Sequence, residues 1–87
     1  MLPSTETKDD FFESRDQNLI TLLLALGHKC TNYYRKSGIV TVCFNRAEVK
    51  AHVDAFYMNI PIPIADARSF IVAQTIFRSM VKEAQYE

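Results

Sequence analysis

Two cysteines and two histidines are the side chains of this sequence best suited to nucleophilic or metal chemistry. Cys30 and Cys43 fall in segments with the composition of β-strands, away from helix N-termini, where a thiolate would be favoured. His28 follows one predicted helix and His52 lies inside another. Together these four residues lack the closely spaced ligand pairs of structural zinc sites. The sequence therefore predicts structural cysteines and no metal site.

Other catalytic patterns are equally weak. The only adjacent carboxylates, Asp9 and Asp10, stand at the end of a polar N-terminal stretch. The only glycines are Gly27 and Gly38, so there is no glycine-rich loop to bind phosphate. We therefore predict that the protein is not an enzyme and needs no cofactor.

Composition indicates one ordinary globular domain. The chain has 87 residues, of which 48% are hydrophobic and 23% charged, and its net charge is zero. The longest apolar run, Leu22 to Leu26, is far too short to span a bilayer, and residues 1–10 lack the features of a signal peptide. Two cysteines fit a reduced compartment. We expect a cytoplasmic protein without a membrane partner.

One segment, 14–27, has the pattern of a helix buried on more than one side. Ser14 with Gln17 fits a capping box, Asp16 is a second candidate N-cap, and Gly27 can end the helix in a left-handed conformation. The leucines and isoleucine between them fall on two faces of a helix. We expect this helix to lie between a sheet and other helices.

Strands are predicted on both sides of this helix. Residues 1–9 read as a disordered arm, and Phe11 and Phe12 then suggest a short edge strand that delivers one phenylalanine to the core. After the helix, segments 28–35 and 39–44 are rich in threonine, tyrosine and β-branched residues and predict a hairpin.

The hairpin has two competing registers. A three-residue loop of Lys36, Ser37 and Gly38 would pair Tyr34 with Val40, whereas a two-residue turn would pair Tyr33 with Val42. We favour the three-residue loop. It places Val40, Val42 and Phe44 on the core face and Tyr33, Arg35, Thr41 and Cys43 on the opposite face.

Two helices complete the domain. Asn45 and Glu48 form a capping box for the first, whose apolar stripe is Val49, Val53, Phe56 and Tyr57. This helix must end by Asn59, because the prolines in 60–64 enforce an extended linker. Asp66 caps the last helix. The predicted fold is α+β: a disordered arm over 1–9, then a single domain over 10–87. In this domain a small antiparallel sheet packs against three helices, in the order β-α-β-β-α-α.

Two surfaces are candidates for binding. Residues 29–50 contain five basic residues and one acidic residue, a net charge of +4, and basic side chains beside tyrosines can bind phosphates and stack on bases. The candidate nucleic-acid-binding residues are Lys29, Tyr33, Arg35, Lys36, Arg46 and Lys50. A second, apolar surface would suit a protein partner or a second copy of the chain. Its residues are Tyr57, Met58, Ile60, Ile62 and Ile64.

The chain also resembles a known family. The resemblance covers about residues 11–82 and rests on four segments. These are the stretch from Phe12 to Asp16, the leucine-rich helix ending in Gly27, a hairpin ending at Phe44 and the opening of the last helix. They are similar to a family of small domains of unknown function met in phage, plasmid and other mobile-element genomes. The resemblance brings no catalytic residues.

It implies a small cytoplasmic accessory protein that acts by binding. Our leading prediction is a non-enzymatic interaction protein that binds another protein, such as a host or defence component. The alternative is a weak nucleic-acid-binding module that uses the hairpin, and a homodimer is left open.

Overall fold

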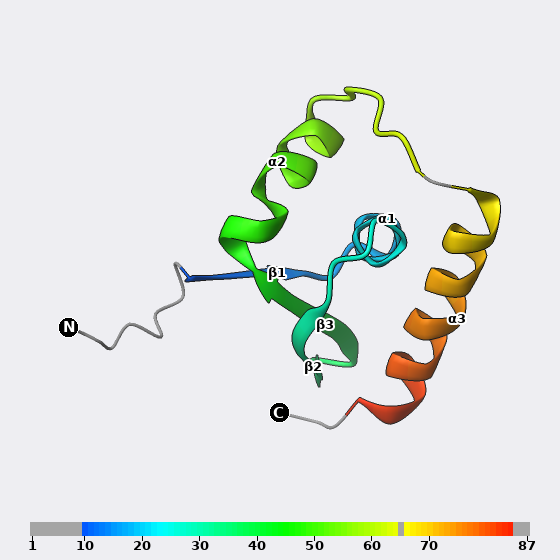
Figure 1. Cartoon of the computed structure of the whole chain (residues 1–87). Coiled ribbons are helices and arrows are strands. Elements are labelled where there is room, and N and C mark those ends of the chain that lie inside the picture. Colours follow the sequence, from blue (N-terminus) through cyan, green and yellow to red (C-terminus); the bar gives the residue numbers. More distant parts are fainter. Residues whose placement is uncertain (1–9, 65, 85–87) are drawn as a thin grey trace.

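The computed structural model of the chain describes residues 10–64 and 66–84, and these form the predicted α+β fold (Figure 1). The elements follow in the order β1 (Phe11–Ser14), α1 (Gln17–Ala25), β2 (Cys30–Lys36), β3 (Ile39–Asn45), α2 (Arg46–Tyr57) and α3 (Ala67–Glu83). The strands form one antiparallel sheet in the order β1-β3-β2, so the short first strand lies at an edge, as predicted. The predicted N-terminal arm lies outside the described residues, as do residues 85–87.

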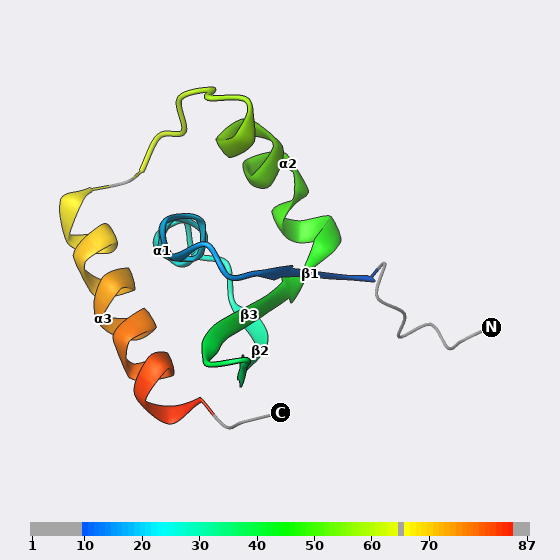
Figure 2. The same ribbon diagram turned by 180° about the vertical axis from the view of Figure 1, so that it is seen from behind.

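Helix α1 lies at the centre of the molecule. Figures 1 and 2 show it nearly end-on, with α2 on one side, α3 on the other and the sheet beneath it. Leu19, Ile20 and Leu23 are fully buried, and even Thr21 is only 3% exposed. The prediction of a helix buried on more than one side is therefore confirmed.

The start of α1 differs in detail from the prediction. Asp16 is the N-cap, and its Oδ1 accepts hydrogen bonds from the N–H groups of Asn18 and Leu19 at 2.9 and 3.3 Å. Ser14 instead belongs to β1, where it pairs with Val42, and its Oγ accepts from the Asp16 N–H. The predicted capping box of Ser14 with Gln17 is wrong, because Ser14 is part of strand β1 and not the N-cap of α1.

The end of α1 is closed by Gly27, as predicted. Its φ of +93° lies in the left-handed region. The N–H of Gly27 donates to the carbonyl of Leu24, and that of His28 donates to the carbonyl of Leu23, each at 3.1 Å. This is a Schellman motif, which satisfies carbonyls at the helix end and fixes the direction in which the chain leaves.

The hairpin adopts the two-residue turn, so the favoured register is wrong near the tip. Lys36 pairs with Ile39 and Tyr33 with Val42, and both turn residues, Ser37 and Gly38, have positive φ. Such turns match the right-handed twist of the strands. A bulge between Cys30 and Asn32 then shifts the pairing by one residue, so that Cys30 lies opposite Phe44.

This register changes the face of two predicted surface residues. Tyr33 pairs with Val42 and Arg35 with Val40, so both point to the side of the sheet that the helices cover. Thr41 and Cys43 lie on the opposite face, as predicted, together with Glu13 of β1. Thr41 and Cys43 are nevertheless buried.

The last two helices begin as predicted, and α2 also ends as predicted. The Asn45 side chain accepts from the Glu48 N–H at 3.2 Å, and the Asp66 side chain accepts from the Ser69 N–H at 2.8 Å. Helix α2 ends at Tyr57, and Asn59 has a φ of +59°. Residues 60–64 then form an extended linker to α3.

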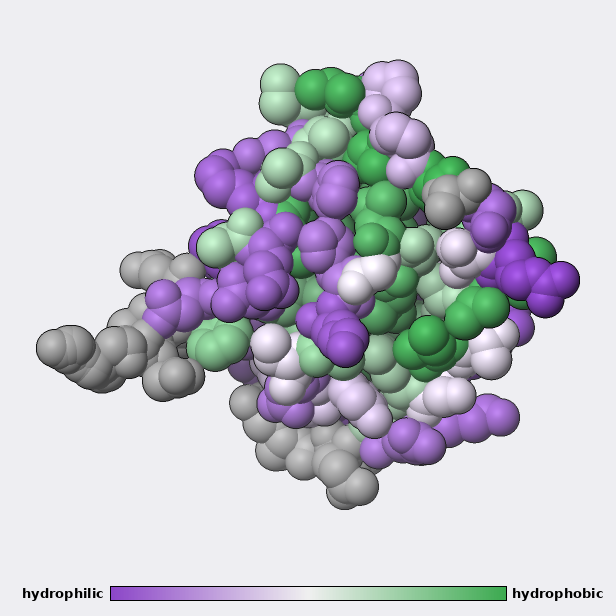
Figure 3. Space-filling view, viewed as in Figure 1, coloured by the Kyte–Doolittle hydropathy of each residue, from purple (hydrophilic) through white to green (hydrophobic). Residues whose placement is uncertain are grey.

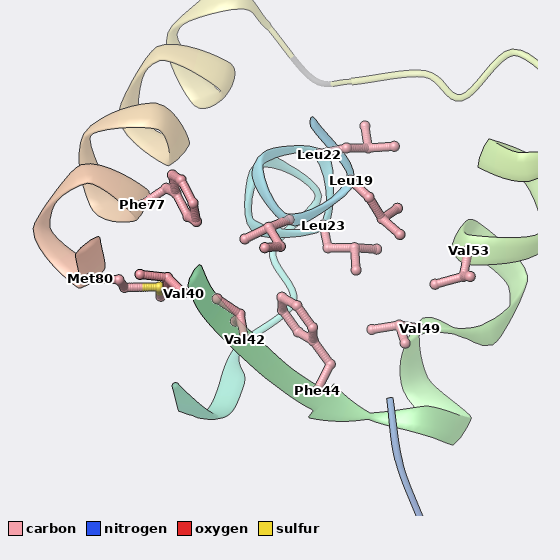
Figure 4. Close-up of a cluster of buried hydrophobic side chains, with 11 residues drawn as sticks. Leu19, Leu22, Leu23, Val40, Val42, Phe44, Val49, Val53, Phe77 and Met80 are labelled. Carbon is pink, nitrogen blue, oxygen red and sulfur yellow. The ribbon is translucent and has the colours of Figure 1, made fainter. Parts of the chain in front are cut away.

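Side chains from every helix and from β3 meet in one core (Figure 4). Phe77 and Met80 reach it from α3, Val49 and Val53 from α2, and Val42 and Phe44 from the sheet. The leucines of α1 lie between these groups. Of the two phenylalanines in β1, Phe12 packs against the core, as expected for one of them.

Removal of a core leucine tests the central position of α1. We expect Leu23→Ala to lower the free energy of unfolding by about 2–5 kcal/mol, because it leaves a cavity in a fully buried site. Urea denaturation measures this loss. Leu24→Ala, at a half-buried position on the same helix, is the control and should cost less. Equal losses would contradict the position of α1.

The turn can be tested through Ser37, whose φ of +54° is unfavourable for serine. We expect Ser37→Asn to raise the free energy of unfolding by about 0.5–1 kcal/mol, because asparagine tolerates this conformation, and Ser37→Val to lower it. Thermal or urea unfolding of both variants measures these changes. In a three-residue loop Ser37 would have negative φ, and the two substitutions would no longer differ in this direction.

Candidate functional site

Three large apolar side chains are exposed where α2 ends. The exposed fractions are 61% for Tyr57, 68% for Met58 and 49% for Ile60. We call these three residues the α2-end surface. A second Schellman motif fixes the backbone here: the Asn59 N–H donates to the Phe56 carbonyl at 3.2 Å, and the Ile60 N–H donates to the Ala55 carbonyl at 2.9 Å. The surface is therefore held in place by the helix end.

A hollow of about 500 Å³ opens beside this surface. The described residues that line it carry no charge, and they are Leu22, Phe56, Tyr57, Asn59, Ile60 and Ile62. The rings of Phe56 and Tyr57 pack edge to face, with centroids 5.4 Å apart, which orients the exposed tyrosine. In Figure 3, hydrophobic residues are visible at the top of the molecule, over the linker between α2 and α3.

The predicted protein-binding residues thus divide into two groups. Tyr57, Met58 and Ile60 are exposed, whereas Ile62 and Ile64 are half-buried and pack against the core. The linker therefore contributes Ile60 to the α2-end surface, while its other two isoleucines pack against the core. Tyr57 was also expected in the apolar stripe of α2, and there the prediction was wrong, because the side chain is mostly exposed.

Sequence reasoning missed a second apolar surface, on α3. Ile71, Val72 and Ile76 are 60%, 49% and 41% exposed. Val72 and Ile76 also line a smaller hollow of about 280 Å³ against Leu24 and Ala25 of α1. The signal was present in the sequence. These three residues are β-branched and apolar, yet they are not among the residues that α3 buries, which are Ala73, Phe77 and Met80.

The candidate nucleic-acid-binding residues do not gather on one face. The Tyr33 hydroxyl donates to Glu83 at 3.2 Å, and an Arg35 N–H donates to the carbonyl of Val81, so both residues join β2 to the end of α3. Arg46 donates to the Phe11 carbonyl at 3.0 Å, at the other edge of the sheet.

The three lysines of that set lie at separate places. Lys50 forms an ion pair with Asp54 on the outside of α2, with an N–O distance of 2.7 Å. Lys29 is exposed just before β2, and Lys36 is exposed at the hairpin turn. These positions give no continuous basic surface.

The two thiols are poor nucleophiles. Burial, and secondarily the nearby Glu13 carboxylate, raise the pKa of the Cys43 thiol to about 11. The Glu13 Oε2 atom also accepts a hydrogen bond from the Tyr34 hydroxyl at 3.2 Å. Burial raises the pKa of Cys30 too. Both thiols are thus protonated at neutral pH, in keeping with the predicted structural role.

His28 and His52, which lie 24 residues apart in the sequence, are in contact. The Nε2 atom of His28 lies 2.8 Å from the Nδ1 atom of His52, and the ring centroids are 5.0 Å apart. Burial, and then the neighbouring His52, lower the pKa of His28, while Glu48 acts in the opposite direction. This contact could not be predicted from the sequence, because a Schellman motif and the packing of α2 bring the rings together.

Comparison of the chain with protein-family models, with curated proteins and with solved structures finds no match. Among the described residues, no helix combines the length and the apolar character that crossing a membrane requires.

The histidine pair predicts a pH-dependent stability. The lowered pKa of His28 means that the folded state disfavours the charged imidazole, whereas the unfolded chain takes up a proton near pH 6.5. Stability is therefore full above about pH 6.5 and declines as the pH falls below it. Urea denaturation at about pH 7.5 and pH 5 measures this, with His28→Gln as the control. If the free energy of unfolding of the wild type falls no more than that of His28→Gln, the lowered pKa of His28 is not the cause of the decline.

Proposed function

We propose that this protein is a non-enzymatic interaction domain that binds a protein partner through the α2-end surface. The observation that carries the proposal is the exposure of Tyr57, Met58 and Ile60 side by side on a fixed turn, next to an uncharged hollow. Aromatic residues and methionine are enriched in protein interfaces, and rigid anchors bind at a lower entropic cost than mobile ones.

The uncharged lining of the hollow supports a partner that presents apolar side chains. Because no described residue lining it is charged, a charged group placed there would lose its hydration without gaining an ionic contact. The matching ligand is a partner segment that inserts one or two apolar side chains. Methionine adapts its shape readily, so the exposed Met58 suits contact with partner side chains of different form.

The partner's origin follows from the resemblance alone. Small domains of phage and plasmid genomes act within a host cell, and a host protein is therefore the expected partner.

The alternative, binding to nucleic acid through the hairpin, has less support. Arg35 and Tyr33 contact α3, Arg46 contacts β1, and Lys50 pairs with an aspartate on its own helix. Nucleic-acid binding draws most of its affinity from clustered cations that neutralise adjacent phosphates. The spacing of these groups over two edges of the sheet disfavours it.

The proposal is tested by the peptides that the protein selects from a random display library. We expect the selected peptides to share apolar residues without a required charge. Tyr57→Ala should weaken their binding by about 2 kcal/mol, roughly 30-fold in Kd, because it removes an interface anchor. Fluorescence anisotropy with labelled peptides measures the change.

Ile60→Thr and Ile39→Thr form a matched pair for this test, since the two isoleucines are 49% and 47% exposed at different places. Only Ile60→Thr should weaken binding. Weaker peptide binding by Ile39→Thr, or unchanged binding by Tyr57→Ala, would contradict the proposal that peptides bind at the α2-end surface. Salt-sensitive binding to DNA or RNA that Lys29→Glu with Lys36→Glu abolishes would favour the alternative.

A further inference from the structure

The contact between His28 and His52 joins two segments that are distant in the sequence. His28 lies in the connection from α1 to β2, where its own N–H is held by the carbonyl of Leu23. His52 lies in the middle of α2. Both rings are half-buried. The backbone therefore fixes the two imidazoles at both attachment points, and their ring nitrogens face each other at 2.8 Å.

Two facing imidazole nitrogens resemble one edge of a metal-coordination site. With Zn–N bonds of about 2.0–2.1 Å and a tetrahedral angle, the two nitrogens would stand about 3.3 Å apart. The distance of 2.8 Å would thus have to open by only about half an ångström, which small side-chain rotations supply. In the present contact one nitrogen carries the shared proton. Metal binding requires that proton to move to the remote nitrogen of the same ring, so that both lone pairs face the ion.

We propose that His28 and His52 bind a borderline divalent metal ion such as Zn²⁺, with Glu48 as a third ligand. Imidazole nitrogen and carboxylate oxygen are donors that suit this class of ion. A site with three protein ligands leaves at least one position to water, so the ion would exchange readily. This site is separate from the α2-end surface and does not depend on the proposed function.

Glu48 is the natural third ligand for two reasons. It precedes His52 by four residues on α2, a spacing that places both side chains on the same face of the helix. Its charge also reaches His28, whose pKa it raises against the effects of burial and of His52. Over residues 10–64 and 66–84, no three His, Cys, Asp or Glu side chains are grouped so that they could hold a metal ion. The Glu48 side chain must therefore turn inward when the ion binds.

An ion held by both histidines would fasten α2 to the connection between α1 and β2. Its binding would therefore stabilise the folded state by mass action.

The test is thermal unfolding of the full chain at pH 7 with increasing ZnCl₂. We expect the Tm to rise with the Zn²⁺ concentration in the wild type, and this rise to disappear in His52→Gln, whose glutamine retains one hydrogen-bonding group toward His28. Lys29→Gln, next to His28 and exposed, is the matched control and should keep the full rise. Circular dichroism of each metal-free variant verifies that it is folded.

Further variants separate the ligands. Glu48→Gln should shift the Zn²⁺ dependence to higher concentrations, and an unchanged curve would remove Glu48 from the site. Cys30→Ser should leave the rise intact, and Co²⁺ should bind without the near-ultraviolet charge-transfer band of a thiolate ligand. No rise in the wild type, a rise that survives in His52→Gln, or a thiolate band would each overturn the proposal.

Discussion

The burial of α1 on several sides is the constraint on which the rest of the structure depends. A nine-residue helix with five buried residues cannot exist alone in water, because its apolar faces must be covered. The sheet covers one side, α3 a second and α2 a third (Figure 1). Each of these elements is amphipathic and gains its own stability from the same contacts. The domain is thus a set of half-apolar elements arranged around one short apolar helix.

Much of this fold could be predicted from the sequence, because the signals were local. Asn45, Asp66 and Gly27 mark helix ends through side-chain or backbone chemistry that acts within a few residues. The hairpin tip was harder. Ser37 carries a weaker preference for positive φ than asparagine or glycine, and a bulge at the far end of β2 restores the other register there. A pattern of alternating residues cannot reveal a bulge, since both registers satisfy part of it.

The candidate sites depended more heavily on tertiary structure. Met58 and Ile60 could be identified because the prolines end α2 and leave apolar residues at the helix end. The role of Arg35 could not be predicted. The face of β2 on which it lies depends on the hairpin register, and its partner, the carbonyl of Val81, lies far along the chain. The contact of His28 with His52 was equally hidden, because it arises only when α2 packs beside the end of α1. Long-range contacts of this kind leave no periodic trace in the sequence.

The order of strands in the sheet has a consequence for the folding pathway. β2 and β3 are joined by a two-residue turn and can pair early, since closing so short a loop costs little entropy. β1 pairs only with β3, about thirty residues away along the chain, and α1 and β2 lie between them. Its docking must therefore wait until β3 has formed and α1 has crossed the sheet. We therefore expect the four-residue edge strand to pair later than the hairpin.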